Sequence, residues 1–202
     1  RAGMELPETD YSAEDRKDRD IKTRLLEINK IAATYYYHQL KSEAGKSGLD
    51  YLVKRGLSDK TINSFGLGYA PQSTGELYRM LKDKGYDDGI LKESGLFTYE
   101  KGVRDKFWNR VIFPIMDINN KVIGFGGRVM GDAKPKYLNS PETKLFDKSR
   151  NLYGLNAART ARKNNLIICE GYMDVISLHQ AGFTQAVASL GTALTPGHAR
   201  LM

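Results

Sequence analysis

The sequence predicts an α+β N-terminal region with an antiparallel sheet, joined to the first βαβ unit of an α/β domain. Three observations lead to this fold class. Apolar residues recur at helical spacing over residues 21–40. Two short apolar runs, 111–115 and 121–125, flank a turn-like segment and predict a hairpin. Residues 166–188 then read as strand, helix and strand, the pattern of a parallel βαβ unit with a right-handed crossover.

The chain is expected to begin with a charged segment and one long amphipathic helix. Residues 1–20 are dense in charge and poor in large apolar side chains, so we interpret them as a solvated linker or the frayed start of a helix. The helix over 21–40 presents its apolar face through Ile21, Leu25, Ile28, Ala32 and Tyr36. In the tyrosine run 35–37, we expect some rings to pack in the core and others to cover the surface.

Shorter helices are expected between residues 50 and 95. Gly56 separates two of them, and Ser58 has the side chain of an N-cap for the second. Ser73 and Glu76 have capping-box spacing ahead of a helix that runs to about residue 84. A further short helix over 88–94 stops at Gly95.

The positive charge of the chain is concentrated around the predicted hairpin. Of a net charge of +7, residues 101–150 alone carry 11 basic and 5 acidic side chains. Glycines at 126 and 127 allow close approach to the backbone, and aromatic residues lie among the lysines and arginines of the strands and their connecting loops. This pattern fits a polyanion such as nucleic acid, and it fits equally a solvated charged face. Trp108, beside Phe107, is expected in the core.

Several classes of protein are excluded by composition. No apolar stretch approaches the ~20 residues that span a bilayer, and no signal peptide opens the chain. Cys169 is the only cysteine, on a strand predicted to be buried, which excludes an internal disulfide and a cysteine-rich zinc site and fits a cytoplasmic protein. Three scattered histidines lack metal-ligand spacing, and no glycine-rich loop has the setting of a nucleotide fingerprint.

The βαβ segment carries the carboxylates most suited to chemistry. Glu170 stands where the first strand ends, and Asp174 follows four residues later near the start of the helix. Open α/β sheets bind ligands at the carboxyl ends of their strands. Both residues also have ordinary interpretations, because the helix macrodipole alone favours an acidic residue in the first turn and a strand-end glutamate can simply face solvent.

Three blocks together resemble the RNA-polymerase core of bacterial replicative DNA primase. They are GFGGRVMGDAKPKYLNSPET, FDKSRNLYGLNAA and IICEGYMDVISLHQAGFTQAVASLGTALT, and YLVKRGLSDKTINSFGLGYAP is similar to the N-terminal part of that core. The EGYMD segment resembles the opening of a Toprim domain. On this resemblance we divide the chain into a charged linker (1–20), a basic, nucleic-acid-facing primase core subdomain (21–160), and the beginning of a Toprim domain (161–202).

The resemblance implies synthesis of short RNA primers on a single-stranded DNA template from ribonucleoside triphosphates. Glu170 and Asp174 are then catalytic and metal-site residues for Mg²⁺ or Mn²⁺, with Glu170 a candidate general base, and Lys136 joins them at the reacting phosphates. Nucleotide and nucleic-acid contacts are expected from Arg55, Arg128, Lys136, Tyr137 and Lys148, with Lys134 and Arg150 as weaker candidates.

The resemblance also implies parts that this sequence does not contain. Toprim enzymes complete their metal site with an Asp-x-Asp pair on a later strand, which we expect beyond Met202, so the chain as given is expected to be inactive alone. A separate zinc module upstream and a helicase-binding module downstream are expected in the longer protein. The implied partners are template, primer, replicative helicase and single-strand-binding protein; a monomer at the replication fork is expected.

Two other functions remain open. The chain can be a non-catalytic single-stranded-DNA-binding module whose basic hairpin does the binding. It can also belong to another Toprim enzyme, a nuclease or topoisomerase, although the GGRVMGDAKPKYLNSPET block argues against this.

Overall fold

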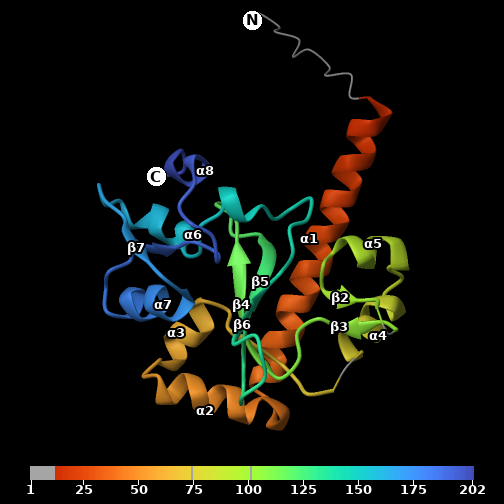
Figure 1. Cartoon of the computed structure of the whole chain (residues 1–202), viewed down its shortest axis with the longest axis horizontal. Coiled ribbons are helices and arrows are strands. Elements are labelled where there is room, and N and C mark those ends of the chain that lie inside the picture. Colours follow the sequence, from red (N-terminus) through yellow and green to blue (C-terminus); the bar gives the residue numbers. More distant parts are fainter. Residues whose placement is uncertain (1–11, 74, 101) are drawn as a thin grey trace, which may run out of the picture.

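A four-stranded antiparallel sheet forms the centre of the molecule in the computed structural model, which describes residues 12–73, 75–100 and 102–202. Its strand order is β1-β4-β5-β6, with β1 at Gly68–Ala70, β4 at Arg110–Met116, β5 at Val122–Val129 and β6 at Tyr137–Asn139. The predicted hairpin is thus confirmed as β4 and β5 (Figure 1). Its turn is closed by Asp117, whose carboxylate accepts hydrogen bonds from the backbone N–H groups of Asn119 (2.8 Å) and Lys121 (2.9 Å).

Helix α1 (Ala13–Leu40) covers one face of this sheet. Its buried residues pack with Ile112 and Phe125 of the central strands, and Tyr36 contributes the ring that meets Phe125 edge-on at 5.5 Å. Tyr36 is buried whereas Tyr35 and Tyr37 are partly exposed, which confirms the mixed role expected for the tyrosine run.

Of the two interpretations of residues 1–20, the start of a helix is right for residues 13–20 and the linker is wrong there, because α1 already begins at Ala13. The helix begins there because Ser12 and Asp15 form a capping box, so that two end groups of the backbone are satisfied reciprocally. Asp18 is also paired with Lys22 and with Lys144 of a distant loop, both at 2.7 Å. Residues 1–11 lie outside the described part of the chain.

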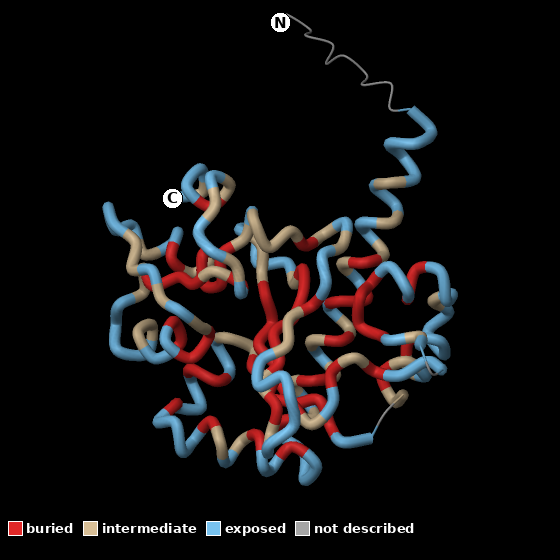
Figure 2. The backbone as a smooth tube through the Cα atoms, viewed as in Figure 1, coloured by how far each residue is buried: buried red, intermediate tan, exposed pale blue. Residues whose placement is uncertain are grey.

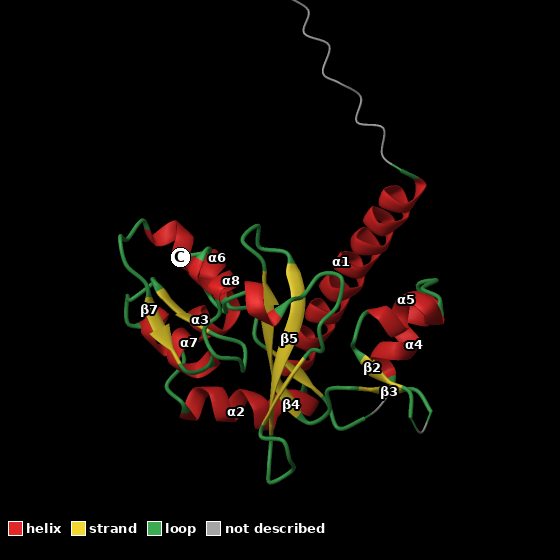
Figure 3. Ribbon diagram, turned by 45° about the horizontal axis from the view of Figure 1, so that its top comes forward, coloured by secondary structure: helices red, strands yellow, loops and turns green. Residues whose placement is uncertain are grey.

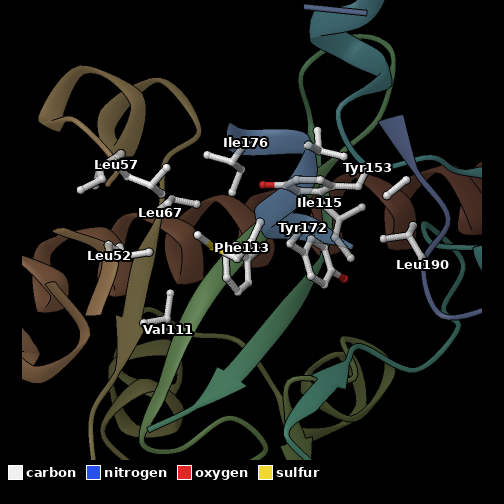
Figure 4. Close-up of a cluster of buried hydrophobic side chains, with 14 of the residues drawn as sticks. Leu52, Leu57, Leu67, Val111, Phe113, Ile115, Tyr153, Tyr172, Ile176 and Leu190 are labelled. Atoms are coloured by element: carbon white, nitrogen blue, oxygen red, sulfur yellow. The ribbon is translucent and has the colours of Figure 1, made fainter. Parts of the chain in front are cut away.

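The other face of the sheet is covered by α2 (Lys46–Lys54), α3 (Asp59–Ser64) and α7 (Tyr172–Gln180). Alternate residues of β4, including Val111, Phe113 and Ile115, point into this second core (Figure 4). Because both faces of β4 are covered, six of its seven residues are buried, and Figure 2 shows the buried backbone concentrated in these central strands. Ser58 caps α3 by accepting from the N–H of Thr61, as predicted.

A helical lobe lies beyond α1, with α4 (Glu76–Asp83), α5 (Asp88–Glu93) and the short hairpin of β2 (Phe97–Thr98) and β3 (Arg104–Asp105) (Figure 3). The predicted N-cap of α4 is wrong: Gly75 is the N-cap, and the Ser73 hydroxyl donates to the Glu76 carboxylate instead. The buried carboxylate of Asp105 takes over the capping, since it accepts from the N–H groups of Gly75 (2.9 Å) and Tyr78 (3.4 Å).

Trp108 also departs from the expectation of a core position, because its side chain is 45% exposed. Phe107 enters the core as expected. Asn109, immediately after Trp108, has a positive φ of 47°, so the chain turns sharply between the buried Phe107 and the start of β4.

The predicted βαβ unit is present. Strands β7 (Ile167–Cys169) and β8 (Ala186–Ala188) pair in parallel on either side of α7. The expectation that β7 is buried is only partly right: within the described chain β7 pairs with β8 alone, and Ile168 is 43% exposed. A loop region with η2 (Lys148–Arg150), α6 (Leu155–Ala158) and η3 (Arg159–Ala161) precedes it, and α8 (Pro196–Ala199) follows. Two further elements are η1 (Glu43–Gly45) and the bridge between Tyr153 and Ala188.

None of the helices in the described part of the chain combines the length and the apolar content that crossing a membrane requires.

Candidate active site and nucleic-acid interface

Glu170 and Asp174 lie together at the carboxyl edge of the parallel strand pair. Glu170 follows the last residue of β7, and Asp174 is in the first turn of α7, whose N-cap is Gly171. Both side chains are exposed, and Asp174 contributes, after the dominant effect of burial, to raising the pKa of the Cys169 thiol. The two carboxylates therefore face solvent at the edge where α/β sheets bind ligands.

These two carboxylates do not form a complete protein metal centre. Among residues 12–73, 75–100 and 102–202, no group of three or more His, Cys, Asp or Glu side chains is placed to hold a metal ion. Mg²⁺ is commonly held by one or two carboxylates together with substrate phosphates and water. Glu170 and Asp174 can supply the carboxylates of such a site, but they cannot hold a metal ion without ligands from outside the described residues.

Tyr172, between the two carboxylates, anchors their segment in the second core. Its ring stacks on Phe113 with centroids 4.9 Å apart and an interplanar angle of 7°, and Tyr153 meets it edge-on at 4.7 Å. The rings group together in Figure 4. Gly126 of β5 lies against the hydroxyl end of this ring, because a Cβ atom there would approach the Cζ and hydroxyl oxygen of Tyr172 to 2.4 Å. Burial, with a smaller contribution from Tyr137, raises the pKa of the Tyr172 hydroxyl well above its usual value.

An arginine–tyrosine cluster, made of Tyr51, Arg55, Arg128 and Tyr137, lies beside this segment. The guanidinium carbon of Arg128 sits 4.1 Å from the ring centroid of Tyr51, a cation–π contact. Burial and Tyr51 raise the pKa of Tyr137, whereas the positive charges of Arg128 and, least of all, Arg55 lower it. The Tyr137 ring lies 6.4 Å from that of Tyr172, which connects the cluster to the carboxylate segment.

The cluster is assembled from three elements that are distant in sequence. Arg55 caps the C-terminus of α2, one turn after Tyr51 on the same helix. Arg128 is on β5 and Tyr137 is its register partner on β6. Three of the predicted nucleic-acid-binding residues, Arg55, Arg128 and Tyr137, are therefore brought together by the fold.

The loop before β6 presents Lys134 and Lys136 to solvent. A buried arginine, Arg110, holds this loop: its Nη1 donates to the carbonyls of Gly127 (3.2 Å), Pro135 (3.0 Å) and Lys136 (3.4 Å). Burial lowers the pKa of Arg110, yet its bonds to three carbonyls keep the loop against the sheet.

Lys148 and Arg150 lie on a separate segment, η2, and no contact among the described residues joins their side chains to the arginine–tyrosine cluster. The buried His198 of α8 holds this segment, because its Nε2 lies 2.8 Å from the carbonyl oxygen of Lys148. Arg150 is 3.6 Å from Asp147. The structure thus groups some of the predicted site residues and leaves these two apart.

The cations of the interface lack acidic partners, although Arg128 also donates from Nη1 to the carbonyl oxygen of Val129 at 3.0 Å. None of the ion pairs in the described part of the chain includes Arg55, Arg128 or Lys136. Unpaired arginine and lysine side chains interleaved with tyrosine rings offer phosphate contacts and stacking surfaces, the combination that single-stranded nucleic acid requires.

Sequence reasoning missed three residues of this site. Tyr51 had a signal, since it stands four residues before Arg55 on one helix. Arg110 and Asn139 had none that is local. Arg110 contacts the loop before β6. Asn139 contacts Tyr172 at the start of α7 and the carbonyl oxygen of Leu190.

Two family models together match most of this chain. Residues 35–159 match the family described as DNA primase catalytic core, N-terminal domain, and residues 164–202 match a Toprim domain. The chain is 50% identical over 188 residues to the DNA primase of Clostridium acetobutylicum, covering 92% of this chain and 31% of the relative. It is 48% identical over 207 residues to that of Deinococcus radiodurans, covering 100% and 34%. The chain thus spans about a third of the length of these curated relatives.

Solved structures show the same fold. One is described as the DnaG primase catalytic domain bound to ssDNA, with a TM-score of 0.86 and 40% identity over 91% of this chain and 58% of that one. The RNA polymerase domain of Mycobacterium tuberculosis primase DnaG, in complex with a double-stranded DNA oligomer with a 6-nucleotide overhang, gives a TM-score of 0.84 and 36% identity, covering 89% and 58%. The predicted fold class and resemblance are confirmed. The chain belongs to the DNA primase catalytic core family.

Proposed function

We propose that this chain is the nucleic-acid-facing part of a primase, which synthesises short RNA primers on single-stranded DNA by nucleotidyl transfer from ribonucleoside triphosphates. The observation that carries the proposal is the junction at Tyr172. Tyr172 lies between Glu170 and Asp174 in sequence, and its ring stacks on Phe113 and lies beside Tyr137 of the arginine–tyrosine cluster. Polymer synthesis needs both the carboxylates and the cluster, because carboxylates must stand beside the phosphates that cations and stacking rings hold in place.

The proposed roles follow from position. Glu170 and Asp174 would hold a divalent cation, Mg²⁺ or Mn²⁺, together with nucleotide phosphates; the cation supplies charge neutralisation at the reacting phosphate. The Lys136 side chain is exposed, no ion pair in the described part of the chain includes it, and it is proposed to bind nucleotide phosphates. Arg55, Arg128 and Tyr137 are proposed to contact the template strand, and Lys148 to add a separate phosphate contact.

The proposal extends to partners and setting through the relatives. A structure of the Aquifex aeolicus primase comprises zinc-binding and RNA polymerase domains, so we propose that zinc belongs to a separate module. Association with the replicative helicase and single-strand-binding protein at a cytoplasmic replication fork is proposed for the full-length protein, acting as a monomer.

A template-dependent incorporation assay tests the function. The full-length gene product is incubated with a single-stranded DNA template, labelled ribonucleotides and Mg²⁺, with parallel reactions that lack template or contain deoxyribonucleotides only. RNA that requires the template is the expected product. Salt-dependent binding to single strands without any synthesis would contradict the proposal and favour the non-catalytic binding module.

The 202-residue chain alone is proposed to be inactive. Its described residues supply two acidic ligands at the carboxyl edge and no metal-binding group of three or more. Template-dependent incorporation by this polypeptide would contradict that expectation without touching the function of the full-length protein.

A further inference from the structure

The side-chain amide of Asn139 joins three segments of the site. It lies on β6, two residues after Tyr137, and is partly buried. Its Oδ1 accepts a hydrogen bond from the Tyr172 hydroxyl at 2.7 Å, and its Nδ2 donates to the carbonyl oxygen of Leu190 at 2.9 Å. A carbonyl can only accept, so the Leu190 bond fixes which end of the amide faces Tyr172.

The two partners of Asn139 stand just beyond the two parallel strands. Tyr172 follows β7 and Leu190 follows β8, so the amide of a strand in the antiparallel sheet spans the carboxyl edge of the parallel pair. Both partners are buried, Tyr172 at 7% and Leu190 at 1% exposure. The hydrogen bonds of this amide are partly buried, and a missing partner costs more there than in open water.

Tyr172 cannot adjust independently of the sheet. Its ring is held on one side by Phe113, meets Tyr153 edge-on, and leaves no room for a Cβ at Gly126. Its backbone sits between Glu170 and Asp174, so the position of its ring and hydroxyl sets the position of both carboxylates relative to β5 and β6.

We infer that Asn139 is a positioning residue: through Tyr172 it fixes the carboxylates of the α7 segment relative to the phosphate-binding side chains of β5 and β6. This role rests on the proposed function. Direct contact of Asn139 with nucleic acid is the competing role, and it is disfavoured because the oxygen and one N–H of the amide are already bonded inside the protein.

Variants of the full-length gene product separate these roles. Tyr172→Phe removes only the hydroxyl and leaves the stacked ring in place, whereas Asn139→Ala removes both hydrogen bonds. The matched control is Gln180→Ala at the other end of α7, where a side-chain amide likewise makes two bonds, to the carbonyl of Gly56 and the N–H of Ser58, both at 2.8 Å.

Three quantities are measured for each variant: kcat and KM for ribonucleotide incorporation, affinity for single-stranded DNA, and the urea midpoint of unfolding. Tyr172→Phe and Asn139→Ala are each expected to lower kcat about tenfold or more, because small displacements of catalytic groups have effects of this order. Single-strand affinity is expected to stay within about twofold. The double variant is expected to be no slower than Asn139→Ala, since the Tyr172–Asn139 hydrogen bond that Tyr172→Phe removes is already lost in Asn139→Ala.

The control is expected to lower the urea midpoint while kcat is unchanged. The inference is overturned if Tyr172→Phe and Asn139→Ala keep the parent kcat, or if Gln180→Ala loses as much kcat as they do. It is also overturned if Asn139→Ala weakens single-strand binding and Tyr172→Phe does not, because Asn139 would then contact the strand directly. A parent protein that makes no primers contradicts the proposed function itself, and the positioning role with it.

Discussion

Replacement of Gly126 by alanine tests whether the carboxylate segment is packed against the basic sheet as closely as the structure shows. The added Cβ would lie 2.4 Å from the Cζ and hydroxyl oxygen of Tyr172, far inside van der Waals contact. The ring has no free direction of escape, because Phe113 stacks on it and Asn139 holds its hydroxyl. The backbone of β5 or the start of α7 must therefore move.

The size of the effect follows from two opposing contributions. Forcing an extra carbon into a packed core costs about 1–3 kcal/mol. Replacing glycine by alanine also restricts the unfolded chain, which stabilises the folded state by about 0.4–1 kcal/mol. We expect the free energy of unfolding to fall by about 1–2 kcal/mol.

Urea unfolding of the parent and the variant measures this difference. Gly124→Ala is the matched control on the same strand and face, since its Cβ would meet Phe146 at 3.2 Å and should cost less. Truncation of the opposing ring in the double variant Gly126→Ala, Tyr172→Leu should make the two changes less than additive. A Gly126→Ala variant as stable as the parent, or more stable, would refute the packing argument.

Two further predictions concern capping and binding. Burial raises the pKa of Asp105 despite its hydrogen bonds from the backbone of α4, so its contribution to stability is greatest below the usual carboxylate pKa of 3.8 and declines as pH rises through the raised value. Asp105→Asn, which no longer titrates, should therefore gain stability relative to the parent between acidic and neutral pH in paired urea titrations; a constant difference would contradict the raised pKa. Arg128→Ala should weaken single-strand binding and reduce the slope of log affinity against log salt by about 0.7, as loss of one phosphate contact requires. An unchanged slope in a binding titration over several salt concentrations would exclude Arg128 from the interface.

Local patterns were enough to predict the hairpin of β4 and β5 and the parallel βαβ unit. Both are specified by apolar runs and turn residues that are close in sequence. The role of Gly126 and Gly127 as points of close approach was also readable, although Tyr172 and Phe107 as the approaching rings were not. Glu170 and Asp174 were located by strand-end logic and by the resemblance together.

The features that the sequence did not predict depend on contacts between residues that are distant in the chain. The start of α4 depends on Asp105, some thirty residues later, which no capping pattern near Ser73 reveals. The exposure of Trp108 depends on a sharp turn that its hydrophobicity does not encode. Asn139 and Arg110 look like ordinary strand residues until the fold brings carbonyls and a tyrosine hydroxyl to them.

The central claim is that Glu170 serves chemistry at the edge of a nucleic-acid-binding surface. The most direct test is Glu170→Gln in the full-length gene product, with primer synthesis and single-strand affinity measured side by side and Glu93→Gln on α5 as an exposed control. We predict that synthesis falls by about a hundredfold or more while single-strand affinity is retained and the control stays active. Primer synthesis at the parent rate by Glu170→Gln would contradict the claim.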